Sequence, residues 1–174
     1  FSKGEMYNAD SIVFSDSLKY KTLVNGRTVH GGGGLMPDIF IPMDTSIPFP
    51  YINRLQRNNI IYNYTLEYID KNREVIKSNY PDFKKFDTKF EVSDEIISEI
   101  AENGVKDGIE KDEVSLAFTK NDIKKQVKAW LAQNLYSRDD FYKVLNKDDE
   151  AVLEALKVLK NQKDYNKLLV STQH

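Results

Sequence analysis

The sequence predicts a mainly α protein with a small β-rich segment at its N-terminal end, an α+β fold class. In residues 1–45, short apolar runs alternate with polar residues and are separated by glycines, which is typical of strands and turns. In residues 46–174, apolar residues recur at helical spacing behind residues that favour helix starts. We therefore expect two domains, a strand-containing segment over 1–45 and a helical domain over 46–174.

The first domain holds few strands. Short strands are expected over residues 11–14, 18–24, 27–29 and 39–41. Asn25 and Gly26 predict a tight turn after the second of them, because both residues tolerate positive φ. A few isolated strands are only marginally stable. We therefore expect this segment to belong to the sheet of a larger α/β domain.

A long helix is expected first in the second domain, after a proline-containing linker over 45–51. Residues 51–80 carry apolar side chains at near-helical spacing and are followed by Pro81, which ends a helix. Residues 82–92 fit either a helix or an irregular packed loop, because their three phenylalanines suit both.

Later helix starts are marked by hydroxyl side chains. Ser93, Thr119 and Ser137 each precede acidic and apolar residues in the manner of N-caps. The helix after Thr119 is expected to have one apolar face, formed by Ile123, Val127, Trp130, Leu131 and Leu135. Residues 146–161 place a leucine-rich stripe on one side of a further helix, and a short last helix is expected over 165–170.

The composition excludes several classes of function. Basic and acidic residues nearly balance, with a formal net charge of −2, so neither nucleic acid nor an anionic membrane surface is an expected partner. The chain has no cysteine and only two histidines, His30 and His174, which argues against a metal site and a Ser-His-Asp triad. No apolar run approaches the ~20 residues that span a bilayer. No metal, no cofactor and no membrane insertion are expected.

Glycines are concentrated in one short segment. Five of the eight glycines lie between Gly26 and Gly34, which indicates a demanding backbone geometry. A phosphate-binding loop would need a lysine and a helix start after the glycines, and a Leu-Met-Pro sequence stands there instead. We expect a tight backbone crossing in a sheet-containing core. Arg27 and Asp38 flank it and could pair across it.

Ser15 or Ser17 with Lys19 or Lys21 is a candidate Ser-Lys dyad. The lysine of such a dyad must be desolvated, so that it is neutral. The surrounding residues are polar and include an acid, which would keep a lysine charged. A solvated turn is therefore expected, and His30 beside the glycines is expected to be structural.

Two charge clusters are interpreted as solvated structure. Acidic residues gather at expected helix starts, where the helix dipole favours them, at Asp139, Asp140, Asp148, Asp149 and Glu150. They lack the spacing of a calcium loop. Four lysines, Lys120, Lys124, Lys125 and Lys128, follow Thr119. We expect these lysines to form the polar face of a helix that packs against the core, rather than a surface that docks on an acidic partner.

The order of motifs in residues 17–44 is specific. The Gly-Arg-Thr-Val element, the glycine run and the Pro-Asp pair contribute Gly26, Arg27, Gly31, Gly32, Gly33, Gly34, Pro37 and Asp38. They lie between a Ser-Leu-Lys-Tyr-Lys-Thr and an Ile-Pro-Met-Asp sequence. This arrangement resembles the C-terminal processing (tail-specific) serine peptidases, in the form found in Bacteroidetes.

The resemblance implies a cell-envelope or periplasmic endopeptidase that cleaves near protein C-termini with a Ser-Lys dyad and often carries a PDZ domain. Neither the nucleophile motif nor the Gly-Lys-Gly turn of that family occurs in these residues. We therefore expect the chain to be the C-terminal portion of such a hydrolase, inactive alone. Protein or peptide substrates are the implied partners, and the helical domain would shape substrate access or assembly.

A stand-alone helical protein-binding or scaffold domain is the alternative. A self-contained sheet in residues 1–45 would favour independence, whereas an orphaned strand edge would favour a larger parent protein. Ligand-dependent stabilisation would instead indicate a phosphate-binding domain. Homo-oligomerisation is left open by the sequence.

Overall fold

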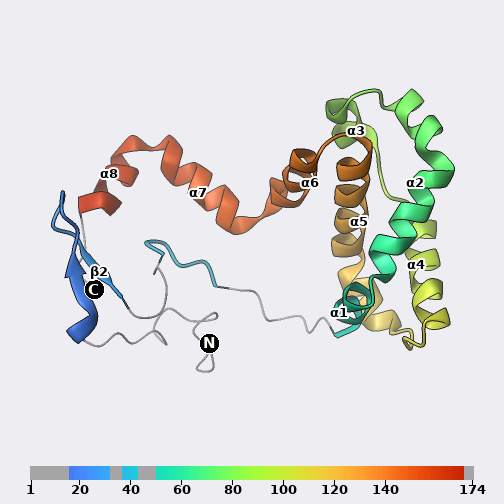
Figure 1. Ribbon diagram of the computed structural model, residues 1–174, viewed down its shortest axis with the longest axis horizontal. Helices are drawn as coiled ribbons and strands as arrows, with labels where there is room; N and C mark the ends of the chain where they lie inside the picture. The colour runs from blue at the N-terminus through green and yellow to red at the C-terminus, as the bar shows by residue number, and fades with distance from the viewer. Residues whose placement is uncertain (1–15, 32–36, 43–49, 171–174) are drawn as a thin grey trace. The chain divides into compact units, whose positions relative to one another are not determined.

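The computed structural model describes residues 16–31, 37–42 and 50–170. The chain divides into two compact units. We call Ile47–Asp148 the helical unit, and Phe1–Ser46 together with Asp149–His174 the hairpin unit. The described residues form eight α-helices and one two-stranded sheet (Figure 1), which confirms the expected mainly α character with a small N-terminal sheet. The predicted domain boundary at residue 45 was that between a peptidase core and a helical domain. The division into two units does not test whether the first segment belongs to such a core.

Six helices build the helical unit. They are α1 (Pro50–Arg57), α2 (Ile60–Asn79), α3 (Phe83–Lys89), α4 (Asp94–Lys106), α5 (Glu113–Leu135) and α6 (Arg138–Leu145). Helix α5 is the central element, because α1, α2, α4 and α6 all pack against it (Figure 1). Helix α4 also packs against α2. A short 3-10 turn, Asn146–Asp148, follows α6.

The core of this unit gathers around α5. The predicted apolar face of that helix is confirmed, because Ile123, Val127 and Leu131 are fully buried and Leu135 is nearly so. Trp130, predicted on the same face, is only half-buried. The region left open between helix and packed loop is α3, whose Phe86 is fully buried.

The prediction of one long helix over 51–80 is wrong, because two helices occupy this span. Helix α1 ends at Arg57, and α2 begins after Asn59, which has a left-handed φ of 57°. Asparagine is among the few residues that adopt this conformation readily. Two consecutive asparagines, Asn58 and Asn59, therefore allow the break although the apolar spacing continues through it.

The helix start predicted at Thr119 is also wrong. Helix α5 begins at Glu113, and the Asp112 carboxylate caps it by accepting a hydrogen bond of 2.9 Å from the Ser115 backbone N–H. Thr119 lies inside the helix and is buried, with its hydroxyl donating to the Ser115 carbonyl at 2.7 Å. A threonine hydroxyl can be satisfied within a helix in this way, so a cap-like sequence does not fix the start.

Two other predicted starts are placed correctly. Ser137 is the N-cap of α6 and its hydroxyl accepts from the Asp140 N–H, as predicted. Ser93 stands at the N-cap of α4, although its side chain makes no capping bond. Gly108, with φ +82°, follows the end of α4.

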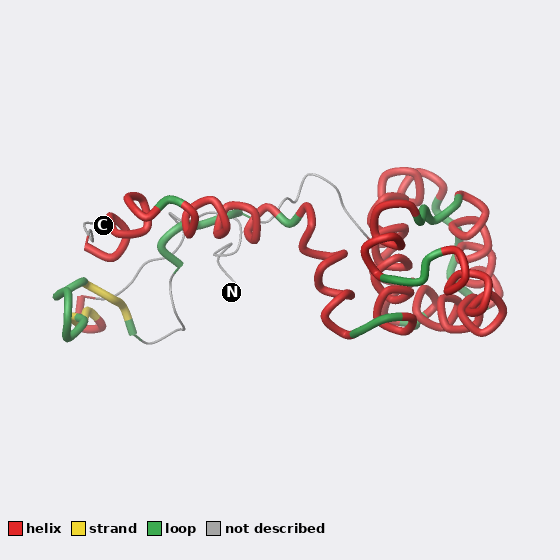
Figure 2. Tube along the Cα trace, turned by 90° about the horizontal axis from the view of Figure 1, so that it is seen from above, coloured by secondary structure: helices red, strands yellow, loops and turns green. Residues whose placement is uncertain are grey.

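The described part of the hairpin unit contains two short strands and two helices. Strand β1 (Lys19–Lys21) pairs antiparallel with β2 (Thr28–His30), with Tyr20 opposite Val29. Figure 2 shows these strands in yellow, and a 3-10 turn, Asp16–Leu18, precedes them. Helices α7 (Glu150–Lys160) and α8 (Gln162–Val170) complete the described part.

Two strand predictions are corrected here, and a third lies outside the described residues, at 11–14. The strand expected over 18–24 ends at Lys21, and Leu23 and Val24 lie in the turn with exposed fractions of 102% and 94%. Residues 39–41 form no strand. Apolar alternation predicts a strand only where a partner edge is present to pair with it.

The described part of the hairpin unit contains no buried residue. The strand β1 is exposed throughout, and neither α7 nor α8 buries a side chain. Leu153, Leu156 and Leu159, which belong to the stripe noted on α7, are all exposed. No described helix of either unit is long and apolar enough to cross a membrane.

Candidate functional site

The turn of the β-hairpin is held by its own backbone. The Thr22 N–H donates to the Arg27 carbonyl at 2.8 Å, and the Arg27 N–H donates to the Thr22 hydroxyl oxygen at 2.9 Å. Gly26 adopts φ +61°, a conformation that a side chain would strain. The tight turn predicted at Asn25 and Gly26 lies within this turn, which is closed by Thr22 and Arg27.

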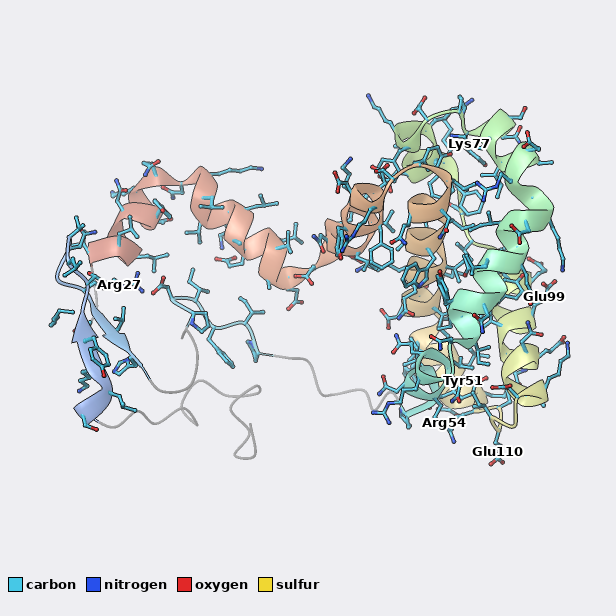
Figure 3. The ribbon with its side chains drawn as sticks, viewed as in Figure 1. Arg27, Tyr51, Arg54, Lys77, Glu99 and Glu110 are labelled. Atoms are coloured by element: carbon cyan, nitrogen blue, oxygen red, sulfur yellow. The ribbon has the colours of Figure 1, made fainter. Side chains whose placement is uncertain are left out.

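Arg27 and Asp38 form an ion pair between the guanidinium Nη2 and a carboxylate oxygen, which confirms that these residues pair. Figure 3 shows Arg27 beside the hairpin. The Arg27 side chain is only 17% exposed, so the pair is partly shielded from water. The pair connects the end of the hairpin turn with Asp38, which lies C-terminal to the glycine run. Gly32, Gly33 and Gly34 lie outside the described residues.

Gly31 lies close to the Tyr20 ring within the same hairpin. A Cβ atom built there would lie 3.0 Å from Cε2 of the Tyr20 ring, which is too close without a shift of the ring. Pro37, which precedes Asp38, is exposed. Among the residues of the predicted family motif, Arg27 and Asp38 therefore lie together. Gly26 is favoured by its positive φ, and Gly31 by its short distance to Tyr20.

The Ser-Lys dyad considered at the start of the chain has the wrong surroundings. Lys19 and Lys21 lie on β1, which is exposed throughout. The Lys21 ammonium donates to the Thr28 hydroxyl at 2.7 Å on the surface of the hairpin. A lysine on an exposed strand lacks the buried, apolar surroundings that a catalytic lysine base requires.

The helical unit has a pocket of about 500 Å³ where four helices meet. We call it the Trp130 pocket, and its lining residues are Gln56, Asn59, Ile61, Tyr62, Gln126, Trp130, Phe141 and Leu145. They come from the end of α1, the start of α2, the middle of α5 and the helix α6. The break at Asn59 is thus also part of the pocket wall.

Three aromatic rings form one side of this pocket. The Tyr62 and Trp130 rings meet edge to face with centroids 4.7 Å apart, and the Trp130 and Phe141 rings meet at 4.6 Å in a tilted arrangement. Such pairs stabilise each other by ~0.5–1.5 kcal/mol beyond the area they bury. The rings therefore hold one another in place before any ligand arrives.

Three side-chain amides are among the polar groups of the pocket. Among the described residues, the side chains of Gln56, Asn59 and Gln126 make no hydrogen bond. Asn59 occupies the N-cap position of α2 without capping it through its side chain. None of the lining residues is charged at neutral pH. The pocket thus offers uncharged donors and acceptors beside an apolar wall.

A second, smaller hollow of about 290 Å³ is polar. Asn63, Asn103 and Lys106 are among its lining residues. At its wall, the Tyr64 hydroxyl donates to a carboxylate oxygen of Glu99 at 2.7 Å, between α2 and α4 (Figure 3). Burial, together with this hydrogen bond, raises the pKa of the Tyr64 hydroxyl above its usual range. The Tyr64 phenol therefore stays protonated and is unsuited to act as a base.

The structure confirms the interpretation of the lysines on α5 as the polar face of a packed helix. Lys120 and Lys124 both reach Asp94 and lower the pKa of its carboxyl group to about 2. Lys125 pairs with Asp148. Lys128 donates to two backbone carbonyls at the end of α3. Each of the four cations has a partner inside the helical unit.

The acidic residues at the helix starts also have structural roles. The Asp140 carboxylate accepts from the Ser137 hydroxyl at 2.7 Å and pairs with Lys143 at 2.8 Å. Asp149 caps α7 by accepting from the Val152 N–H at 2.9 Å. No group of three His, Asp or Glu side chains suited to a metal ion is found in the described ranges.

Comparison with known proteins places the helical unit in a family. Residues 51–139 match a family described as a family of unknown function, DUF8443. The chain belongs to this family. No curated protein and no solved structure matches the chain. The DUF8443 match covers α1 to α5 and the start of α6, so it contains six of the eight residues of the Trp130 pocket.

Sequence reasoning did not predict the Trp130 pocket. Trp130 was expected on the packed face of a helix, and it contributes to the aromatic wall instead of being fully buried. Gln56, Asn59 and Gln126 follow no periodic pattern that separates them from ordinary surface residues. The consecutive asparagines before an apolar run were the available sign of a helix break at this point.

Proposed function

We propose that this chain is the C-terminal portion of a cell-envelope serine endopeptidase of the C-terminal processing type. The first segment contributes strands and the glycine-rich turn to the catalytic α/β core of the parent protein. The helical unit, which contains the DUF8443 match, governs substrate access or assembly. The proposal rests on the resemblance of residues 17–44 to that peptidase family.

The observation that supports the proposal is the exposure of apolar side chains in the described part of the hairpin unit. Tyr20, Leu23 and Val24 are all strongly exposed there. A two-stranded hairpin is marginal in water by itself and needs further strands or a covering helix. The Arg27–Asp38 pair nevertheless holds the hairpin in a defined shape. A shaped but uncovered hairpin supports an origin in a larger sheet.

A helical protein-binding domain is the second candidate, and it has its own observation. The helical unit has a continuous core of its own, in which Tyr51, Leu55, Phe86 and Ile100 are fully buried. The family match lies on this unit alone. A unit with its own core can bind proteins with or without a peptidase attached to it.

The test uses the protein encoded by the reading frame that contains this sequence. We expect upstream of Phe1 a small-residue-Ser motif and a Gly-Lys-Gly turn, and cleavage of a quenched fluorescent peptide by the purified long protein. Replacement of that serine by alanine should abolish cleavage, and the present chain alone should show none. Cell fractionation of the long protein should recover it from the envelope.

A matched pair of variants connects this test to the hairpin. Arg27→Ala removes the pair with Asp38 and should lower the peptidase activity of the long protein. Arg57→Ala, at the exposed end of α1, should leave it unchanged. A frame that starts at or near Phe1, or a long protein without cleavage activity, overturns the peptidase proposal and favours the binding domain.

A further inference from the structure

We propose that the Trp130 pocket binds a large uncharged apolar side chain of an extended peptide segment, whose backbone is held by the amides of Gln56, Asn59 and Gln126. This inference concerns the helical unit alone. It stands whether or not the chain belongs to a peptidase.

The size of the pocket suits a peptide segment, and its wall suits an apolar side chain of that segment. Its volume of about 500 Å³ falls within the ~300–1,000 Å³ that is usual for ligand sites. Tyr62, Trp130 and Phe141 offer ring surface, and Ile61 and Leu145 add aliphatic surface. Burying a Leu or Phe side chain against such surface contributes ~1.5–3 kcal/mol.

The absence of charge in the lining selects against a charged occupant. Charged residues make up 30% of the chain, yet the lining residues include none of them. A carboxylate or an ammonium group entering the pocket would lose its water without gaining an opposite charge, which is costly. An uncharged side chain has no such cost.

The amides select for an extended peptide backbone. Each amide group carries both a donor and an acceptor, which matches the N–H and C=O of a peptide group. A helical partner has already paired these backbone groups internally, so it would leave the amides without partners. An extended segment presents free N–H and C=O groups on either side of the inserted side chain. The geometry therefore favours an extended segment over a helix.

The experiment uses the full 174-residue chain, in which Trp130 is the single tryptophan and thus reports on the pocket. The probes are blocked pentapeptides, acetyl-Gly-Ser-X-Ser-Gly-amide, in which X is Leu, Phe, Asp or Lys. We expect the Leu and Phe peptides to shift the Trp130 emission with saturation. The Asp and Lys peptides should bind at least tenfold more weakly.

Variants distinguish the pocket from nonspecific binding. Gln126→Ala should weaken binding of the Leu peptide several-fold, and Phe141→Ala should weaken it further, with far-ultraviolet circular dichroism confirming that each variant is folded. Asn103→Ala is the matched control, because it removes an amide from the polar hollow instead. It should bind the peptide as the unchanged chain does.

Three results would overturn the proposal. The first is equal binding of the Leu and Asp peptides, or no binding of either. The second is unchanged affinity in the folded Gln126→Ala variant. The third is binding of N-acetyl-leucinamide as tight as that of the Leu peptide, which would indicate a small-molecule site with no role for an extended backbone.

Discussion

The helical unit and the hairpin unit contain similar kinds of apolar side chains but use them differently. Leu131 on α5 is completely buried, whereas Leu156 on α7 keeps an exposed fraction of 45%. All buried residues of the described chain lie between Tyr51 and Val144. Burial of apolar surface is the main favourable term in folding. The helical unit therefore has a core that can stabilise it, whereas the described part of the hairpin unit has no such core.

The largest expected difference in stability is between Leu→Ala substitutions in the two units. Leu131→Ala should lower the free energy of unfolding of the chain by ~2–5 kcal/mol, because it leaves a cavity in the core. Leu156→Ala should change it by less than ~0.5 kcal/mol, since an exposed side chain loses little contact. Urea unfolding followed by circular dichroism measures both. Equal losses would show that α7 is packed in solution.

A second comparison concerns two half-buried lysines on α5, Lys128 and Lys125, which differ in their partners. The Lys128 ammonium donates to the carbonyls of Asp87 and Phe90 at 2.8 and 2.9 Å, and burial lowers its pKa. Lys128→Met leaves both carbonyls without this donor and should cost ~1–3 kcal/mol. Lys125→Met removes a more exposed ion pair and should cost ~0–1 kcal/mol. Thermal unfolding of the two variants would contradict this account if their midpoints fell equally.

Substitutions of two glycines with positive φ compare the two units through smaller changes in the free energy of unfolding. Gly108 has φ +82° and Gly26 has φ +61°, and a Cβ at either would meet no atom within 4 Å. Alanine therefore adds backbone strain alone, ~1–2 kcal/mol at each position. Gly108→Ala should destabilise the helical unit by that amount. Gly26→Ala should leave the unfolding transition of the helical unit unchanged, and a shift there would mean that the two units unfold together.

The smallest effect is electrostatic and lies on the surface of the helical unit. Lys120 and Lys124 lower the pKa of Asp94 to about 2 from its ordinary 3.8. This carboxylate therefore stabilises the fold above about pH 4, and that contribution is lost as the pH falls from about 4 to 2. Asp94→Asn should flatten the pH dependence of stability in this window. Asp122→Asn is the control, and an identical flattening by it would refute the assignment.

Sequence patterns predicted the parts of this fold in which local and tertiary preferences agree. The buried face of α5 follows helical spacing, and the Ser137 cap lies directly before α6. Errors arose where one local pattern has two physical outcomes. Thr119 could cap a helix or bond within one, and Asn59 could continue a helix or adopt a left-handed turn.

The candidate site was less predictable than the fold. The pairing of Arg27 with Asp38 was expected from their positions around the glycines. The Trp130 pocket combines side chains that are far apart in sequence, from Gln56 to Leu145. Only the packing of four helices brings them together. Spacing along the chain carries no information about such a meeting.

Hydrogen exchange of the 174-residue chain tests the contrast between the two units most directly. Amides of α2 and α5 should exchange only through unfolding of the helical unit, whereas the hairpin amides of β1 and β2 should exchange within seconds, because few contacts protect them. In the long protein the hairpin amides should become protected. Protection of β1 and β2 in the present chain equal to that of α5 would contradict the account, because it would show that the hairpin needs no covering surface.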